Sequence, residues 1–282
     1  MEDNTHFLLE ETVLSNTSRI LTYLIAILYA ILGILLFLLG GQLAPVFAWK
    51  VTPFMAATMG GWCIGNAWSA FFTARRWDWK LVYPSLIYLW VFGVSELAVL
   101  LAFRANLVLQ HPIAWLYLVT ISLNAFAALL GVYEWLRLRP ARETFGSPAG
   151  PFHYVLISIF VLIVATLALY GLYARVGDVG TNGGVFPEVM SLFTLRAFAV
   201  FYLSLCTSAA VLLRERNLPT MLHYGFSSYL LVLAITAAIF MYFDLFDFST
   251  HPGQLIYVGA YFLIGIPLTL TIIREGTGLR QA

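Results

Sequence analysis

Two charged side chains lie inside apolar stretches of this sequence that are long enough to cross a bilayer. Glu96 lies in the run from Lys80 to Phe103, and Arg196 lies in the run 190–213. An ionisable group at membrane depth costs roughly 2.5 to 3.5 kcal/mol on insertion scales and usually faces the interior of a helical bundle. At about 1.5 Å per residue, both side chains lie roughly 10 Å below the same surface. The sequence therefore predicts either an ion pair between them or a polar feature of a path for a substrate or for protons.

Two side-chain amides, Asn66 and Asn124, are further candidates for a polar site within apolar runs. Small residues recur every four positions beside Asn66: Ala57, Gly61, Gly65 and Ser69. Such a stripe lets the backbone of another helix approach closely, and a nearby amide usually bonds a neighbouring helix. We expect both amides to bond between helices, with a ligand as the alternative.

The five histidines do not form a pattern that would bind a metal or haem. His111 and His251 begin apolar runs at one face, the others lie in the tail or at the opposite face, and no two are four apart. We therefore predict no metal and no cofactor. The 22 Phe and 15 Tyr would nevertheless suit a bound lipid, quinone or pigment.

The composition is that of an all-α integral membrane protein. Apolar residues make up 61% of the chain, charged residues 10%, and the mean hydropathy is +0.87. The formal net charge of +1 and the lack of a basic stripe argue against a nucleic-acid partner. Segments of about 20 apolar residues predict eight transmembrane helices. They are 19–40, 52–74, 81–103, 112–136, 153–174, 190–213, 219–243 and 253–273.

The distribution of Lys and Arg predicts the orientation. Eleven of the fifteen fall in loops on one side and three on the other, which places both termini in the cytoplasm, in a plasma or inner membrane. The turn that begins with Arg75 and Arg76 contains two Trp and is typical of an anchor at the membrane interface.

The chain divides near its midpoint. We expect a cytoplasmic tail (1–18), a first four-helix unit (19–140), a cytoplasmic linker (141–152) and a second four-helix unit (153–282). Three landmarks recur in order at offsets of 138 to 140 residues: Gly33 and Gly171, Arg75 and Arg214, and His111-Pro112 and His251-Pro252. They predict a duplication of two parallel four-helix bundles related by an axis along the membrane normal.

These patterns favour a non-enzymatic transporter or permease for a small or lipophilic solute that is bound between the two halves. The alternative is a structural or assembly subunit of a larger membrane complex, and a third reading is a membrane-embedded enzyme that modifies lipids. The expected partners are membrane lipids, with other membrane proteins or a second copy of the chain as possible neighbours. No nucleophile and base can be placed at one depth, which disfavours the enzyme.

Overall fold

The protein is a bundle of long helices, seen in a computed structural model that describes residues 14–140, 145–176 and 184–275. Eight helices in these ranges have 21 residues or more, and each coincides with one predicted segment. They are α1 (Asn16–Leu38), α3 (Pro53–Arg76), α4 (Trp79–Ala102), α5 (Pro112–Leu138), α6 (Pro151–Tyr173), α7 (Leu192–Leu212), α8 (Leu218–Met241) and α9 (Gln254–Glu275). Short turns α2 (Gly40–Leu43), η1 (Ala44–Val46), η2 (Arg104–Asn106) and η3 (Phe243–Leu245) lie in the connections.

Seven of the described helices are long and apolar enough to cross a membrane, and the chain is an integral membrane protein. The exception is α3, which is rich in Gly, Ala, Ser and Thr. Because 17 of its 24 residues are buried, α3 packs mainly against the rest of the protein. Its low hydropathy reflects this interior position.

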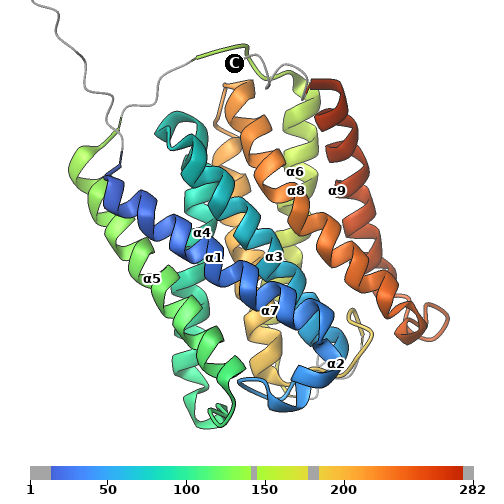
Figure 1. Cartoon of the computed structure of the whole chain (residues 1–282). Helices are drawn as coiled ribbons and strands as arrows, with labels where there is room; N and C mark the ends of the chain where they lie inside the picture. The colour runs from blue at the N-terminus through green and yellow to red at the C-terminus, as the bar shows by residue number, and fades with distance from the viewer. Residues whose placement is uncertain (1–13, 141–144, 177–183, 276–282) are drawn as a thin grey trace, which may run out of the picture.

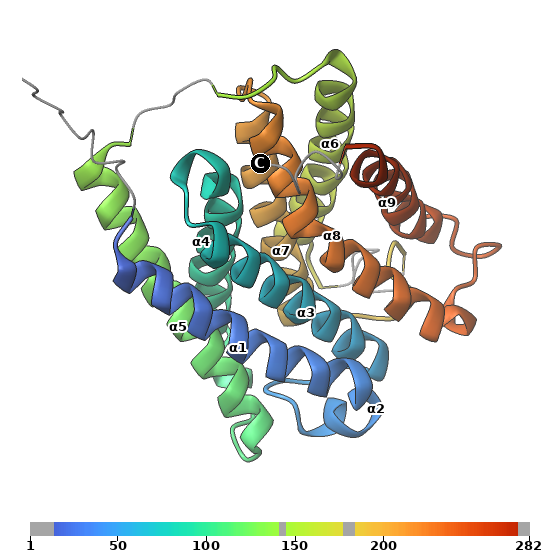
Figure 2. The ribbon, with the colours of Figure 1, turned by 45° about the horizontal axis from the view of Figure 1, so that its top comes forward.

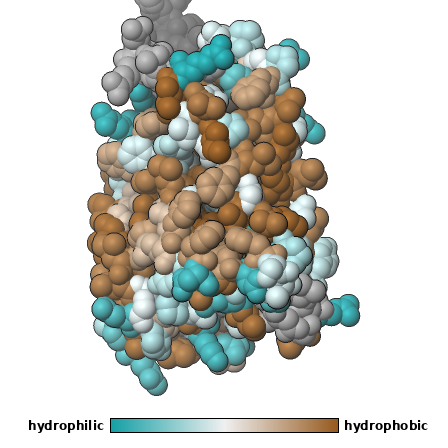
Figure 3. Space-filling model, turned by 90° about the vertical axis from the view of Figure 1, so that its right-hand side faces the viewer, coloured by the Kyte–Doolittle hydropathy of each residue, from teal (hydrophilic) through white to brown (hydrophobic). Residues whose placement is uncertain are grey.

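The outer helices present apolar stripes to the surroundings. Exposed side chains follow one face of α1 at intervals of three and four residues: Ile20, Leu24, Ile27, Ile31, Ile34 and Leu38. Tyr29, Leu32 and Leu36 on the opposite face are fully buried. On the face of the molecule over α6, α8 and α9, a broad hydrophobic band separates two more hydrophilic ends (Figure 3).

For description, α1, α3, α4 and α5 are called the first unit, and α6, α7, α8 and α9 the second unit. In the first unit α1 packs along α3, α4 against α5, and α1 against α5; in the second, α6 packs along α7, α8 against α9, and α6 lightly against α9. The units join through α3 with α8, α4 with α7, and α4 with α8. Helices α1, α3, α4 and α5 thus correspond to α6, α7, α8 and α9. One pair differs between the units, because α3 contacts α4 more extensively than α7 contacts α8. Helices α5 and α9 lie at opposite flanks, with α3, α4 and α7 between them (Figure 1, Figure 2).

Helix caps recur at a constant spacing in the two units. Thr52 caps the start of α3 by accepting a hydrogen bond from the Met55 N–H, and Ser191 caps α7 by accepting one from the Thr194 N–H. The N-cap residues of α4 and α8 are Asp78 and Asn217, and the turns η2 and η3 follow the same two helices. The residue numbers differ by 139 between Thr52 and Ser191, between Asp78 and Asn217, and between the first residues of η2 and η3.

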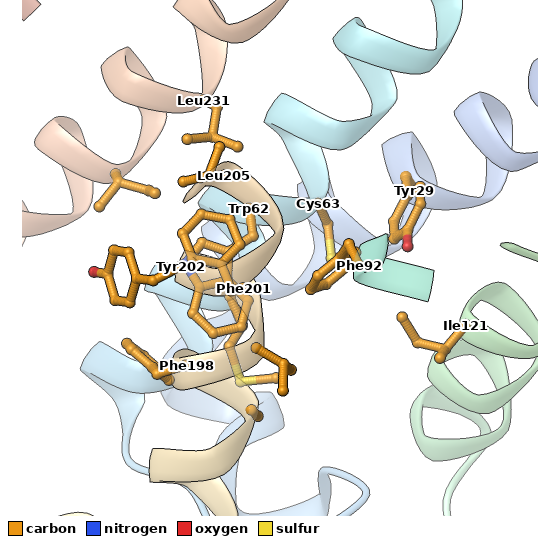
Figure 4. Packing of buried hydrophobic residues seen from close by; sticks show 14 of the residues in the cluster. Tyr29, Trp62, Cys63, Phe92, Ile121, Phe198, Phe201, Tyr202, Leu205 and Leu231 are labelled. Carbon is orange, nitrogen blue, oxygen red and sulfur yellow. The ribbon is translucent and has the colours of Figure 1, made fainter. Parts of the chain in front are cut away.

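The surface where the two units meet is filled. A Cβ at Gly61 would lie 3.2 Å from the backbone of Ala234, which confirms that the small-residue stripe of α3 is a packing face. The Trp62 ring of α3 stacks on Phe201 of α7 with 4.4 Å between ring centroids and contacts Phe198 edge-on (Figure 4). Aromatic rings therefore occupy the centre of this interface.

Candidate functional site

Glu96 is fully buried near the last turns of α4, in the interior of the first unit. Its Oε1 accepts a hydrogen bond of 2.6 Å from the hydroxyl of Tyr117, which lies on α5. Its Oε2 has no hydrogen-bond partner. One carboxyl oxygen is thus held by a neutral donor, and the other faces no polar group within bonding distance.

Arg196 is bound elsewhere, so the predicted ion pair with Glu96 is not formed. Its guanidinium donates to the carbonyl oxygen of Gly171 and, at 2.9 Å, to that of Ala174, where α6 ends. Cations are favoured at a helix C-terminus because the last carbonyls lack partners within the helix. The prediction failed because depth fixes the height of a residue along its helix but not the direction in which it points. Arg196 points from α7 toward α6, and Glu96 points from α4 toward α5.

The two amides bond neighbouring helices. Asn124 of α5 donates through Nδ2 to the Tyr29 hydroxyl of α1 at 2.8 Å. The Tyr88 hydroxyl of α4 donates to Oδ1 of Asn66 of α3 at 2.5 Å. One bond joins α5 to α1 and the other joins α4 to α3, so each helix of the first unit takes part in one of them.

Together these side chains form a buried polar group that we call the Glu96 cluster. Its members are Tyr29, Cys63, Asn66, Tyr88, Glu96, Tyr117 and Asn124. None is more than 3% exposed. The rings of Tyr29 and Tyr88 both pack against Phe92 of α4, so the two hydrogen-bonded pairs share one packed interior. Its described members include a single carboxyl group and several neutral hydrogen-bond donors.

Close packing surrounds this cluster. A Cβ at Gly93 of α4 would lie 2.7 Å from the side-chain carbon Cγ of Asn124. The absence of a side chain at Gly93 therefore leaves room for the Asn124 side chain. The Phe92 ring packs next to this position, with its centroid 6.4 Å from that of Tyr29. Figure 4 shows Tyr29, Cys63 and Phe92 side by side.

The predicted interfacial residues lie at the ends of the bundle, away from the cluster. Arg75 and Arg76 are exposed in the last turn of α3. His111 is the N-cap residue of α5, where its Nδ1 accepts from the Ile113 N–H at 3.4 Å. His251 is exposed before α9 and donates its backbone N–H to the Asp247 carbonyl oxygen.

A second feature of the interior is an apolar crevice in the second unit, with a volume of about 120 Å³. All four helices α6, α7, α8 and α9 line it, and we call it the α6–α9 crevice. His153 and Met221 lie at one end of it, near the starts of α6 and α8, and Leu167 and Tyr202 lie deeper. Its position could not be predicted from the sequence, because most of its lining residues are Leu, Ile, Val and Phe side chains of the kind found throughout apolar helices.

His223 is a buried polar side chain, although the sequence analysis placed it at one face of the membrane. It is 3% exposed in α8, its ring stacks on Phe72 of α3 at 4.9 Å, and neither ring nitrogen has a hydrogen-bond partner. In the part of the chain that the structure describes, no three His, Cys, Asp or Glu side chains lie together as a metal site requires.

No protein-family model, curated protein or solved structure matches this chain. The function is therefore argued from the two interior features, the Glu96 cluster and the α6–α9 crevice.

Proposed function

We propose that this protein binds a lipophilic molecule with an extended apolar chain in the α6–α9 crevice and moves it within the membrane, as a transporter or permease does. The observation that carries the proposal is the crevice itself, whose wall is built from apolar side chains of four helices. Apolar pockets with few polar groups are typical of sites for lipophilic ligands.

The shape of the crevice favours a chain-like ligand. Along α6 its lining runs from His153 to Leu167. At 1.5 Å per residue this is a length of about 20 Å, from the end of the helix to the middle of the bundle. A slot that is long but small in volume fits an acyl or isoprenoid chain better than a compact polar solute.

Three of the hydroxyl groups that line the crevice are already hydrogen-bonded within the protein. The Tyr202 and Tyr261 hydroxyls lie 3.1 Å apart, and the Tyr224 hydroxyl lies 2.6 Å from Ser208 Oγ. A ligand that required strong hydrogen bonds would have to break these pairs. Selection by length and apolar contact is therefore favoured over selection by polar recognition.

The α6 and α9 walls make few contacts with each other, so an entry between them faces the surroundings of the bundle. The face over these helices is hydrophobic between its two ends (Figure 3). In a bilayer this arrangement would admit a ligand sideways from the lipid. Because the interface between the two units is filled by Trp62, Phe198 and Phe201, we place the ligand in the second unit instead of between the units.

We extend the proposal to eight spans in two duplicated units. The buried position of α3 supports counting it as the eighth span, since a helix surrounded by protein does not need a lipid-facing surface. The repeated helix pairs and the caps 139 residues apart support the duplication. Gly33 and Gly171 add to it: the first is at the close approach of α1 to α3, and the second at that of α6 to α7.

The described chain begins and ends at the same end of the bundle, which is also the end where α3 finishes in Arg75 and Arg76 (Figure 1). The excess of Lys and Arg in the loops at this end supports a cytoplasmic location for it. The crevice would then open near the cytoplasmic side, because α6 and α8 begin there.

The test uses two matched Gly→Leu variants. Gly225 lines the crevice, and a Cβ there would meet only the mobile end of Leu268, at 2.9 Å; Gly259 on α9 is exposed with no atom within 4 Å. Purified protein is crosslinked to a phospholipid with a photoactivatable group in its acyl chain, and the sites are mapped by mass spectrometry. We expect labelling of α6 and α9 residues of the crevice, reduced about tenfold by Gly225→Leu because overfilling a tight site costs about 1–3 kcal/mol. Gly259→Leu should leave it unchanged.

Movement is tested in vesicles that contain a fluorescent phospholipid, by the rate at which lipid of the inner leaflet becomes accessible to an external quencher. We expect the wild type and Gly259→Leu to accelerate the exchange and Gly225→Leu not to. Labelling spread evenly over the lipid-facing stripes of α1 and α5, and insensitive to Gly225→Leu, would overturn the binding site. Crevice labelling without exchange would remove transport and leave lipid binding.

A further inference from the structure

The carboxyl group of Glu96 is surrounded by neutral groups. Tyr117 of α5 bonds it directly, and the Tyr117 ring packs edge-on against the rings of Phe47 and Trp49. Helices α3, α5, α7 and α8 pack against α4. Among the residues that the structure describes on these four helices, no cation lies within ion-pair distance of Glu96.

The titratable groups of α7 and α8 are directed elsewhere. Arg196 bonds the carbonyl oxygens at the end of α6, His223 stacks on Phe72, and Tyr224 bonds Ser208. An ionised Glu96 would therefore be a fully buried charge with one neutral donor and one oxygen without any partner. Burying an unpaired charge is so unfavourable that such a group takes up a proton instead.

We infer that Glu96 binds a proton and that the Glu96 cluster is a proton-binding site in the interior of the first unit. The Tyr117 hydroxyl donates to Oε1, which leaves Oε2 as the oxygen that carries the proton. Tyr117 is a positioning residue, because its hydrogen bond fixes which carboxyl oxygen is free. Close packing of Asn124 against Gly93 agrees with a ligand that needs no cavity. The inference is independent of the α6–α9 crevice, which lies in the other unit.

The main test is infrared spectroscopy of the purified protein in lipid bilayers at neutral pH, which detects the carbonyl stretch of a protonated carboxyl group. We expect this band in the wild type and its loss in Glu96→Gln. The matched control is Glu134→Gln at the end of α5, where the carboxylate accepts hydrogen bonds from Ser15 and Ser18. Glu134→Gln should retain the band. Absence of the band from the wild type, or its persistence in Glu96→Gln, would overturn the inference.

Tyr117→Phe separates positioning from mere packing, because it removes only the hydroxyl. We expect the band to shift in frequency and to persist to a higher pH than in the wild type, since the lost donor also bonds the ionised form. If Tyr117→Phe left both the frequency of the carbonyl band and the pH at which the band disappears unchanged, Tyr117 would not position the proton.

A second measurement does not depend on spectroscopy. A protonated Glu96 resembles Gln in shape and charge, so Glu96→Gln should unfold at nearly the same temperature as the wild type near pH 4, where the carboxyl group is protonated in both the folded and the unfolded wild type. Above about pH 4.3 the unfolded wild type ionises while the folded protein keeps its proton, so the unfolding temperature of the wild type should fall progressively below that of the variant toward neutral pH. A wild type that is far more stable than Glu96→Gln at neutral pH would show that the ionised carboxylate is the native form, against the proposal.

Discussion

Gly65 of α3 faces Leu231 of α8 so closely that a Cβ atom at Gly65 would overlap both Cβ and Cα of Leu231. In a membrane the two helices gain little from leaving lipid, and their association depends on close van der Waals packing. The α3–α8 contact is the most extensive one between the two units. This glycine therefore sets the distance at which the units meet.

We expect Gly65→Ala to lower the free energy of unfolding by about 1–3 kcal/mol, because the added methyl group forces the α8 backbone to move. The control is Gly41→Ala in the exposed turn α2, where a Cβ meets no atom within 4 Å, and its effect should stay within about 0.5 kcal/mol. Denaturant titration of both variants in detergent micelles measures the difference. Equal stability of the two would mean that the units are not in close contact at Gly65.

The role of Arg196 leads to a second prediction. Its two hydrogen bonds hold the end of α6 against α7, and hydrogen bonds from charged groups are worth about 1.5–3 kcal/mol each when broken. We expect Arg196→Gln to lower the free energy of unfolding by at least the value of one such bond, about 1.5–3 kcal/mol. The free energy of unfolding of Arg196→Lys should lie between those of the wild type and Arg196→Gln, because a single ammonium group cannot reproduce the planar fork of the guanidinium.

Glu96 should be energetically independent of Arg196. In a double-mutant cycle with Glu96→Gln and Arg196→Gln, we expect the two effects to add within about 0.5 kcal/mol. A coupling well above this value would indicate that the two charges pair in solution, contrary to the contacts seen here.

The sequence was sufficient to locate the long helices, because apolar runs of about 20 residues between polar breaks have few other interpretations. The expected segment 52–74 became Pro53–Arg76, and 81–103 became Trp79–Ala102. The beginnings were set by the caps Thr52 and Asp78, whose side chains accept from backbone N–H groups of the first turn. Burial of Glu96 was also predictable, since a carboxylate in such a run must avoid lipid.

The partner of Glu96 was not predictable in the same way. Tyr117 and Arg196 both lie in apolar runs, and the choice between them depends on the rotation of each helix about its axis. The low hydrophobic contrast between faces of buried helices gives little information on that rotation. The α6–α9 crevice was missed for a related reason: it arises where α6 and α9 fail to pack closely, and a sequence records which residues are present but not the space between them.

The loops opposite the described chain ends carry two carboxyl groups whose pKa values shift in opposite directions. Partial burial raises the pKa of Glu188 above its ordinary value of 4.5, and the hydrogen bond from the Thr52 hydroxyl only partly opposes this. Hydrogen bonds from Ser249 and Thr250 hold the pKa of Asp247 well below its ordinary value of 3.8. The two residues should therefore affect stability with opposite dependence on pH.

For Glu188 the folded protein favours the protonated form, so its contribution to stability is complete below about pH 4.5 and is lost as the pH rises. Glu188→Gln cannot ionise, and its unfolding temperature should rise relative to the wild type between about pH 4 and pH 7. For Asp247 the folded protein favours the ionised form, whose contribution is present above about pH 3.8 and is lost as the pH falls. Asp247→Asn should unfold below the wild type at about pH 7, with a gap that closes in acid. Thermal unfolding of the three proteins across this range checks both signs, and parallel curves would contradict the assigned environments.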